Sequence, residues 1–132
     1  MRGTKLNLVI ASALLSTLFC ARIAQSQTGA ITNKIEAKVL TDLRRARKVA
    51  FFVVLAEQAD LRSAAAVSGW RDRGEAVVNS LRETAGRTQR PLLDFLARFN
   101  AEVTPFWIVN TIKVVTSDEQ LIYSLAALPQ VA

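Results

Sequence analysis

The clearest apolar pattern in the sequence is the run VAFFVVL, from Val49 to Leu55, which is bounded by charged residues. A run of seven residues rich in valine and phenylalanine is typical of a β-strand. Both alternating sets of side chains are apolar, since Phe52 and Val54 oppose Phe51 and Val53. We therefore predict a strand of which both faces are covered.

A second pattern, from Trp70 to Phe99, predicts a long amphipathic helix. Apolar or small residues recur at steps of three and four, the period of one buried stripe on an α-helix. The stripe consists of Val77, Leu81, Ala85, Thr88, Leu92, Leu96 and Phe99. Gly86 and Pro91 interrupt it, so a kink or a two-piece helix is expected, and Asn100 suits a left-handed cap. The arginines on the other faces indicate a solvated side or, alternatively, a groove for an anionic partner.

Shorter patterns complete the order of elements. Residues 35–47 have helical spacing and end in a basic cluster, which is a solvated helix C-terminus or, alternatively, a processing or anion site. Residues 102–115 read as two short strands broken at Asn110 and Thr111. Ser117-Asp118-Glu119 starts a last helix, Pro129 ends it, and Val131-Ala132 begins another extended segment.

These elements predict an α+β fold. Two strand-helix-strand units give a ferredoxin-like antiparallel sheet with both helices on one face. The order here is strand, helix, strand, strand, helix, preceded by a short helix. The final strand of the second unit is missing, so we expect the domain to be incomplete at its C-terminus.

The N-terminus is interpreted as a signal peptide. Arg2 and Lys5 precede a nearly uncharged stretch, Leu6 to Cys20, which has the length of a secretory apolar core and is shorter than a membrane span. Cleavage is expected between Ser26 and Gln27, and an uncleaved membrane anchor is the alternative. The predicted regions are a signal peptide at 1–26, an extension with a short helix at 27–48, and the domain at 49–132. The mature protein would be secreted or periplasmic, with no membrane partner.

Composition narrows the functional class. The chain has 132 residues, 51% of them hydrophobic, which suits one compact domain. Removal of Arg2, Lys5 and Arg22 leaves 14 basic and 11 acidic residues, a formal charge of +3. The chain has no histidine, and its one cysteine lies in the signal segment. Serine or cysteine triads and the usual zinc ligands are therefore excluded from the mature chain.

Other chemistries also find little support in the sequence. Each acidic residue considered as a catalytic carboxylate lies beside arginine or at a helix start, where an ion pair or cap is the simpler interpretation. These residues are Asp60, Asp72, Glu75, Glu83, Asp94, Asp118 and Glu119. Glycine loops for phosphate are absent. We expect a non-enzyme without a cofactor.

Three segments resemble a known family. ADLRSA at 59–64, SLRETAGRTQRPLLDFL at 80–96, and PFWIVNTIKV at 105–114 with the helix and LPQVA after it resemble the N-terminal propeptide of secreted subtilisin-like serine proteases. The likeness covers roughly residues 35–132. It implies an intramolecular chaperone that templates folding of the catalytic domain and then inhibits it. In that family a last strand and a tail in the active-site cleft follow, and neither is carried over to any residue here.

The apolar strands predict a docking surface independently. If helices cover one face of the sheet, the other face should be polar in a domain that works alone. We expect Phe52, Val54, Trp107 and Val109 to face a partner, namely a subtilisin-like protease catalytic domain. The alternative is that the helix at 35–47 covers this face.

Two other functions were considered. A free-standing secreted protease inhibitor or interaction module would need a completing strand from another chain. A ferredoxin-like RNA binder needs exposed aromatic residues on the middle strands, which Ile112, Val114 and Val115 do not supply, so no nucleic-acid partner is expected.

Overall fold

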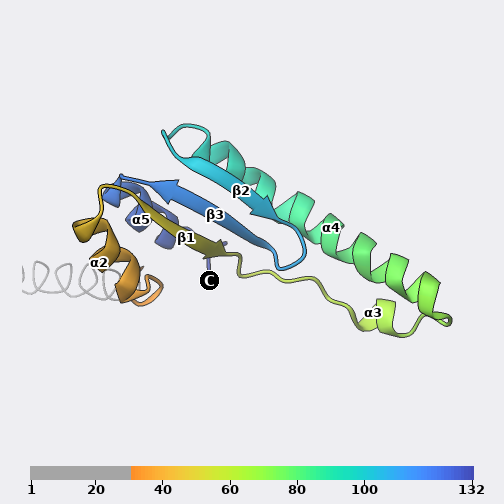
Figure 1. Cartoon of the computed structure of the whole chain (residues 1–132). Coiled ribbons are helices and arrows are strands. Elements are labelled where there is room, and N and C mark those ends of the chain that lie inside the picture. The colour runs from red at the N-terminus through yellow and green to blue at the C-terminus, as the bar shows by residue number, and fades with distance from the viewer. Residues whose placement is uncertain (1–30) are drawn as a thin grey trace, which may run out of the picture. The chain divides into compact units, whose positions relative to one another are not determined.

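The computed structural model describes residues 31–132, of which Ile35–Ala132 form one compact unit. Figure 1 shows the order of the helices and strands along the chain. The elements are α2 Ala37–Arg45, β1 Val49–Val54, α3 Arg62–Ala65, α4 Trp70–Leu96, β2 Glu102–Phe106, β3 Thr111–Thr116 and α5 Glu119–Ala126. The predicted signal peptide and its cleavage site at Ser26 and Gln27 lie outside the described residues.

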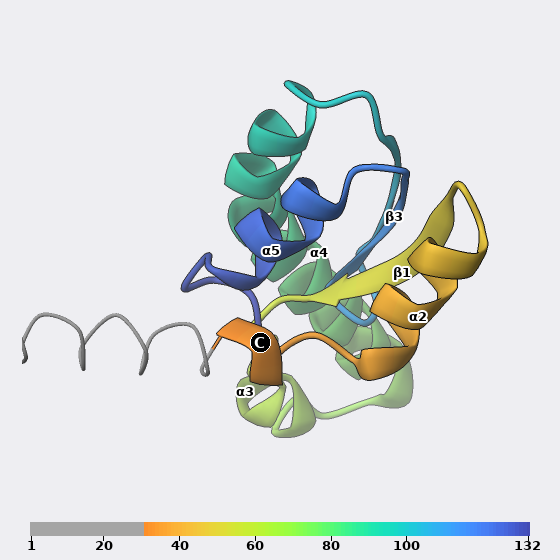
Figure 2. The ribbon, with the colours of Figure 1, turned by 90° about the vertical axis from the view of Figure 1, so that its left-hand side faces the viewer.

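The three strands form one antiparallel sheet in the order β1-β3-β2. Val114 of β3 lies opposite Phe51 of β1 on one side and opposite Val103 of β2 on the other. Helices α4 and α5 both lie on one side of the sheet, which is plain when the molecule is viewed from its end (Figure 2). The expected α+β class, with an antiparallel sheet, is therefore correct.

The hydrophobic core fills the space between the sheet and these two helices. Its buried members are Val53, Leu55, Leu92, Leu96, Ile112, Val114, Leu121, Leu125 and Val131. Alternation along each strand directs every second side chain into this core. We call this side of the sheet the inner face and the opposite side the outer face.

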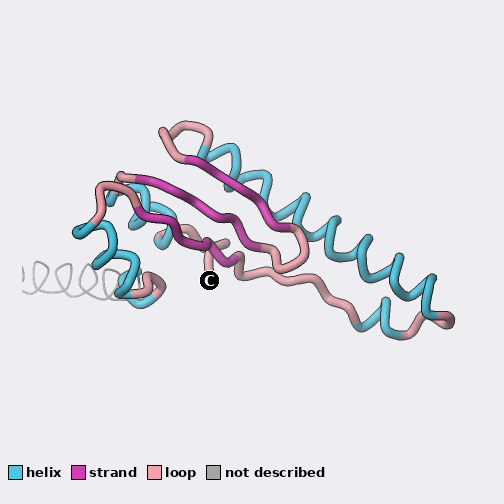
Figure 3. The backbone as a smooth tube through the Cα atoms, viewed as in Figure 1, coloured by secondary structure: helices cyan, strands magenta, loops and turns pink. Residues whose placement is uncertain are grey.

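The C-terminal residues return to β1. Val131 forms an isolated antiparallel bridge with Leu55, and both side chains are buried. Two backbone hydrogen bonds of 2.9 Å flank the bridge, from Ala56 N to Gln130 O and from Ala132 N to Val54 O. The end of the chain thus pairs with the side of β1 that is opposite β3 (Figure 3).

Several boundaries differ from the sequence-based expectations. Of the expected kink or two-piece helix, the two-piece form is wrong, because α4 runs as one helix through Gly86 and Pro91. Pro91 is exposed, so solvent can satisfy the backbone carbonyl that its missing N–H leaves free. Asn100 does not form a left-handed cap, since Asn110 is the only described residue other than glycine with a positive φ. The helix ends instead at Leu96, where tight turns such as Phe99 N to Leu96 O follow.

Candidate interaction surface on the sheet

The outer face of the sheet carries a pair of exposed aromatic rings. Phe52 on β1 is 63% exposed and Phe106 at the end of β2 is 40% exposed. Their ring centroids lie 6.0 Å apart with an interplanar angle of 57°. Such a tilted arrangement is a favourable aromatic contact, but most of the Phe52 surface remains in water. The face therefore presents apolar area that the described helices leave uncovered.

The neighbours of this pair are partly apolar and partly charged. Val54, 45% exposed, continues the outer face of β1 beyond Phe52. In the sheet register, Lys113 lies opposite Phe52 on one side and Thr104 on the other, so its side chain occupies the middle of the outer face. We define the outer patch as Phe52, Val54, Phe106 and Lys113.

An ion pair closes one end of the outer patch. Lys48, just before β1, donates a hydrogen bond to the Glu102 carboxylate at the start of β2. This hydrogen bond, together with the charge of Lys48, lowers the pKa of Glu102. Both side chains are mostly exposed, so this pair contributes little to stability and leaves charge at the rim of an apolar area.

Trp107 and Val109, the other two residues predicted to face a partner, lie in the turn between β2 and β3 and not on the outer face. Strand β2 ends at Phe106, so Trp107 and Val109 belong to the turn and do not continue the alternation of the strand. Trp107 is half-buried against α4, where the Arg82 guanidinium lies 4.9 Å from its ring centroid. Val109 is 56% exposed at the turn. Of the four residues, only Phe52 and Val54 share the outer face, and Phe106 joins them there.

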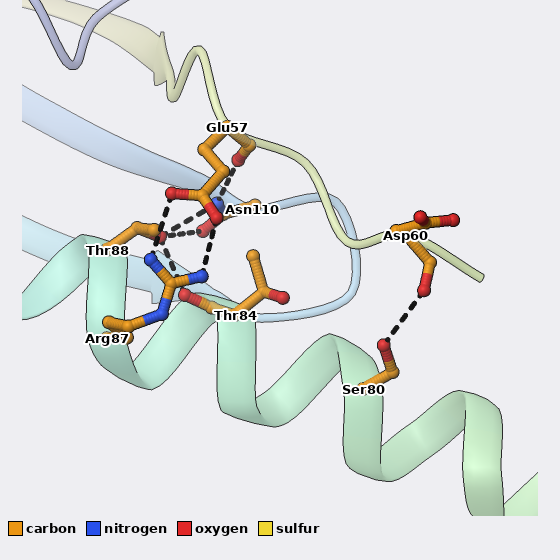
Figure 4. Close-up of polar contacts among 7 residues, drawn as sticks. All are labelled: Glu57, Asp60, Ser80, Thr84, Arg87, Thr88 and Asn110. Atoms are coloured by element: carbon orange, nitrogen blue, oxygen red, sulfur yellow. Dashed lines mark hydrogen bonds and ion pairs between the residues drawn. The ribbon is translucent and has the colours of Figure 1, made fainter. Parts of the chain in front are cut away.

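A buried amide organises this turn. Asn110 is only 3% exposed and has a φ of 40°, in the left-handed region that asparagine tolerates. Its Nδ2 donates to Glu57 O at 2.7 Å and to Thr88 Oγ1 at 2.9 Å (Figure 4). Its Oδ1 accepts from Gln89 Nε2 at 3.0 Å, and the same nitrogen donates to Phe106 O at 3.1 Å. These bonds fix the turn against α4 and against the segment that follows β1.

An exposed ion pair lies beside this network. Arg87 on α4 holds the Glu57 carboxylate through both terminal nitrogens, at 2.9 Å and 2.5 Å (Figure 4). The hydrogen bonds from Arg87 are the main cause of the lowered pKa of Glu57. Asp60 is held in a similar way by Arg62, whose hydrogen bonds lower the pKa of Asp60. Arginine partners thus keep both carboxylates charged, as the sequence-based interpretation of Asp60 as an ion-pair member expected.

A shallow groove separates this ion pair from the C-terminal turn. Its volume is about 460 Å³, and it is lined by Leu55, Ala56, Glu57, Arg87, Thr88, Pro91, Pro129 and Gln130. Its polar walls already bond to one another through the Arg87–Glu57 pair. The charged pair that lines the groove is therefore already engaged and is not free to bind a small ligand.

The sequence did not predict that the side chains of Asn110 and Gln89 would be buried and hydrogen-bonded to each other. Asn110 was expected to mark a break between strands, and an asparagine at such a break is a signal for a left-handed turn residue. Gln89 lies next to the apolar stripe of α4, between Ala85 and Leu92, where periodicity alone did not place it in the interior. Its burial follows from the amide and carbonyl partners that the turn supplies, which are distant in sequence.

Two searches of the described residues and three comparisons complete the description. Within residues 31–132, no group of three or more histidine, cysteine or acidic side chains lies close enough to hold a metal ion. No helix in the same range is sufficiently long and apolar to cross a bilayer. Comparison of the chain with protein-family models, curated proteins and solved structures found no match.

Proposed function

We propose that this chain is a propeptide-like domain of a subtilisin-like serine protease, which templates folding of the catalytic domain and inhibits it. The outer patch is the surface that docks on the catalytic domain. The observation that supports this proposal most directly is the exposure of Phe52 and Phe106 side by side on a sheet whose other face is covered by two helices. The finer architecture we propose is a ferredoxin-like sandwich, completed by a strand next to β1.

The energetics of the outer patch favour a partner. Fully burying a phenylalanine or valine side chain stabilises a complex by roughly 1.5 to 3 kcal/mol relative to leaving it exposed. Phe52, Val54 and Phe106 together therefore offer a useful fraction of a binding energy, while their exposure in the free domain favours association. Lys113 in the middle of the patch and the Lys48–Glu102 pair at its rim add polar contacts of the kind that fix orientation.

The alternative cover, the helix predicted at 35–47, leaves the patch open. This helix is α2, Ala37–Arg45, and it contacts β1. Phe52 nevertheless stays 63% exposed and Val54 stays 45% exposed. A docked partner is the cover that we propose for the surface that these two side chains leave exposed.

Refolding in trans tests this function. A denatured subtilisin-like catalytic domain is diluted into native buffer with and without the whole chain, and recovered protease activity is measured. We expect a severalfold increase with the chain, which a Phe52→Ser, Phe106→Ser double variant loses. Tyr123→Ser is the matched control, because Tyr123 is also a partly exposed aromatic residue but lies on α5. Equal recovery with and without the chain contradicts the proposal.

A second candidate function is a free-standing secreted inhibitor or interaction module that another chain completes. The pairing of Val131 and Ala132 with the end of β1 favours it, because the rest of the β1 edge has no strand partner among the described residues. The refolding yield distinguishes the two functions, because both candidates would inhibit the mature protease. An inhibitor slows the folded enzyme without raising refolding yield, whereas a template raises the yield.

A further inference from the structure

A second groove lies between α4 and the end of β2, and we call it the β2 groove. Its volume is about 450 Å³, in the range of known ligand sites, roughly 300–1,000 Å³. Leu93, Pro105 and Trp107 supply apolar walls, and Arg82 and Arg90 supply positive charge. None of the residues that line it is acidic, and its two arginines take part in none of the ion pairs found among the described residues. The β2 groove therefore offers apolar surface together with unpaired positive charge.

The two arginines and Gly86 form one row on α4. They are spaced by four residues, so the arginines lie near the same face of the helix and about 12 Å apart along its axis. Gly86 leaves a gap between them, because a Cβ at this position would meet nothing within 4 Å. The row thus presents two guanidinium groups on either side of an open space.

Trp107 positions one of these guanidinium groups. The Arg82 guanidinium lies over the Trp107 ring, 4.9 Å from its centroid, which is a cation–π contact. Neither Arg82 nor Arg90 donates a side-chain hydrogen bond to another described residue. A guanidinium held against an aromatic ring keeps its N–H donors for a carboxylate, which it can bind through two parallel hydrogen bonds.

The edge of β2 beside this groove favours an extended ligand. Strand β2 is an outer strand, with β3 on one side only. Because Pro105 lacks an N–H, the hydrogen bonds to β3 belong to its neighbours Thr104 and Phe106. The backbone N–H and C=O of Val103 and the C=O of Pro105 therefore point to the free edge. A peptide that pairs there would place every second side chain on the inner face, towards α4.

The spacing of these side chains matches that of the two arginines. In Figure 1, α4 runs along β2 in the opposite direction, and the two elements are in contact. Side chains on one face of a strand recur about every 7 Å, so the first and fifth residues of a segment are about 14 Å apart. Acidic residues at these two positions would meet Arg82 and Arg90. An apolar third residue would lie over Gly86, between the apolar walls of the groove.

We propose that the β2 groove binds an extended acidic segment of a partner protein, which has acidic residues four positions apart and an apolar residue midway between them. Complementary charge selects the segment, and the free backbone groups of Val103 select a peptide. The outer patch lies on the other face of the sheet, so this interaction is independent of the proposed function and is measured without a protease.

Tryptophan fluorescence of the whole chain tests the proposal. The chain has two tryptophans, and Trp70 does not line the groove and is 87% exposed. Trp70→Phe therefore leaves Trp107 as the only reporter. The probe is the capped peptide Ser-Glu-Ser-Leu-Ser-Glu-Ser, whose pattern is the same in both chain directions. One control peptide has glutamine in place of both glutamates. The other, Ser-Glu-Glu-Ser-Leu-Ser-Ser, keeps the composition but not the spacing.

The probe should change the emission of Trp107 and bind at least about tenfold more tightly than either control peptide. Arg82→Gln and Arg90→Gln should each weaken binding about fivefold or more. Calorimetry measures these two affinities, because loss of Arg82 also alters the surroundings of the reporter. Arg71→Gln removes the same charge from the exposed first turn of α4 and should leave binding unchanged. Equal binding of the three peptides overturns the proposal, and so does an equal loss in all three variants.

A substitution that fills the groove provides an independent check. Gly86→Leu places a side chain in the open space between the two arginines and should weaken binding at least about tenfold. Gly74→Leu is the matched control, because a Cβ at Gly74 also meets nothing within 4 Å, and this variant should bind the probe normally. Unchanged binding by the Gly86→Leu variant would place the peptide elsewhere and would overturn the proposal.

Two other occupants of the β2 groove would give different results. A single-stranded oligothymidylate that displaces the probe and depends on Arg82 and Arg90 would assign the groove to nucleic acid. A dimer of the chain that Gly86→Leu dissociates, measured by sedimentation without peptide, would assign it to a second copy. Either result overturns the proposal.

Discussion

Asn110 Nδ2 donates a hydrogen bond of 2.7 Å to the backbone carbonyl oxygen of Glu57, 53 residues earlier in the chain. This bond joins the β2–β3 turn to the segment that leaves β1, and Gln89 holds the same amide from α4. The turn carries Ile108 and Val109 as exposed apolar residues. The position of the turn beside the outer patch thus depends on one buried asparagine.

Two replacements of Asn110 should separate the contribution of its side-chain hydrogen bonds to stability from that of its left-handed backbone conformation. Asn110→Gly removes the bonds to Glu57 and Gln89 and should cost about 2 kcal/mol, since each buried polar group left unpaired costs ~1–3 kcal/mol. Asn110→Ala should cost about 1 kcal/mol more, because alanine is strained at a positive φ. Urea unfolding measures both losses. Asn79→Ala, at an exposed position of α4, is the control. Equal stability of the glycine and alanine variants would contradict the left-handed conformation.

The Arg87–Glu57 pair predicts a pH dependence. Arg87 lowers the pKa of Glu57 below its ordinary value of 4.5, so the folded state favours the charged carboxylate. The resulting stability is present above pH 4.5 and is lost as the pH falls through the lower pKa of the folded state. Arg87→Gln should therefore flatten part of the acid-side decline in unfolding free energy, and the lowered pKa values of Asp60 and Glu102 should preserve the rest.

The control for this experiment is Arg71→Gln. Arg71 is exposed on the first turn of α4 and makes none of the ion pairs found among the described residues. Its removal changes the net charge as Arg87→Gln does, so it accounts for the general effect of one lost positive charge. If both variants flatten the acid-side decline equally, the local pair is not its cause.

The C-terminal bridge makes a prediction about packing. Val131→Ala should destabilise the domain by about 2 kcal/mol, because the buried Val131 packs against the core beside Leu55. Ala132→Pro removes the N–H that bonds to Val54 O and should cost about 1 kcal/mol. Gln130→Ala keeps the backbone carbonyl that accepts from Ala56 and should change little. Thermal or urea unfolding checks all three. An unchanged stability of the Val131→Ala variant would mean that the end of the chain does not pack against the core.

Local patterns in the sequence were sufficient to predict most of the elements. The run at Val49–Leu55 and the stripe through Ala85, Leu92 and Leu96 predicted β1 and α4, because period and propensity are properties of neighbouring residues. Asp118 was expected at a helix start, and its Oδ1 accepts from Gln120 N and Leu121 N. The short helix α3 was missed, since four residues hold too little periodicity.

The surface was harder to predict than the elements. The exposed side of β1 was identified with Phe52 and Val54, but Phe106 was not among the residues expected on that face. The register of β2 depends on where its strand ends, and that end is set by Asn110 through partners on α4 and after β1. Trp107 then turns to Arg82, a contact between residues 25 positions apart that no local pattern encodes.

Two glycines of α4 should respond in opposite ways to alanine. Gly74 lies inside the helix, and a Cβ there would meet nothing within 4 Å, so Gly74→Ala should stabilise the domain by about 0.5–1 kcal/mol. Gly69 precedes the helix with a φ of 86°, so Gly69→Ala should destabilise it by about 1 kcal/mol. Each variant is the control of the other for the general effect of adding a methyl group at the surface, because both positions are exposed. A shift of the same sign in both would contradict the assigned backbone.

Phe51 and Phe52 give the sharpest test of which side of β1 is the docking side. Phe51 packs against the core, so Phe51→Thr should cost about 2–3 kcal/mol of unfolding free energy. Phe52 is 63% exposed and contacts Phe106, so Phe52→Thr should cost only about 1 kcal/mol. Phe52→Thr should also reduce the binding of an apolar dye to the native domain, which Phe51→Thr should not do. Urea unfolding and dye fluorescence measure these effects. A larger loss of stability for Phe52→Thr than for Phe51→Thr would mean that Phe52, and not Phe51, faces the core.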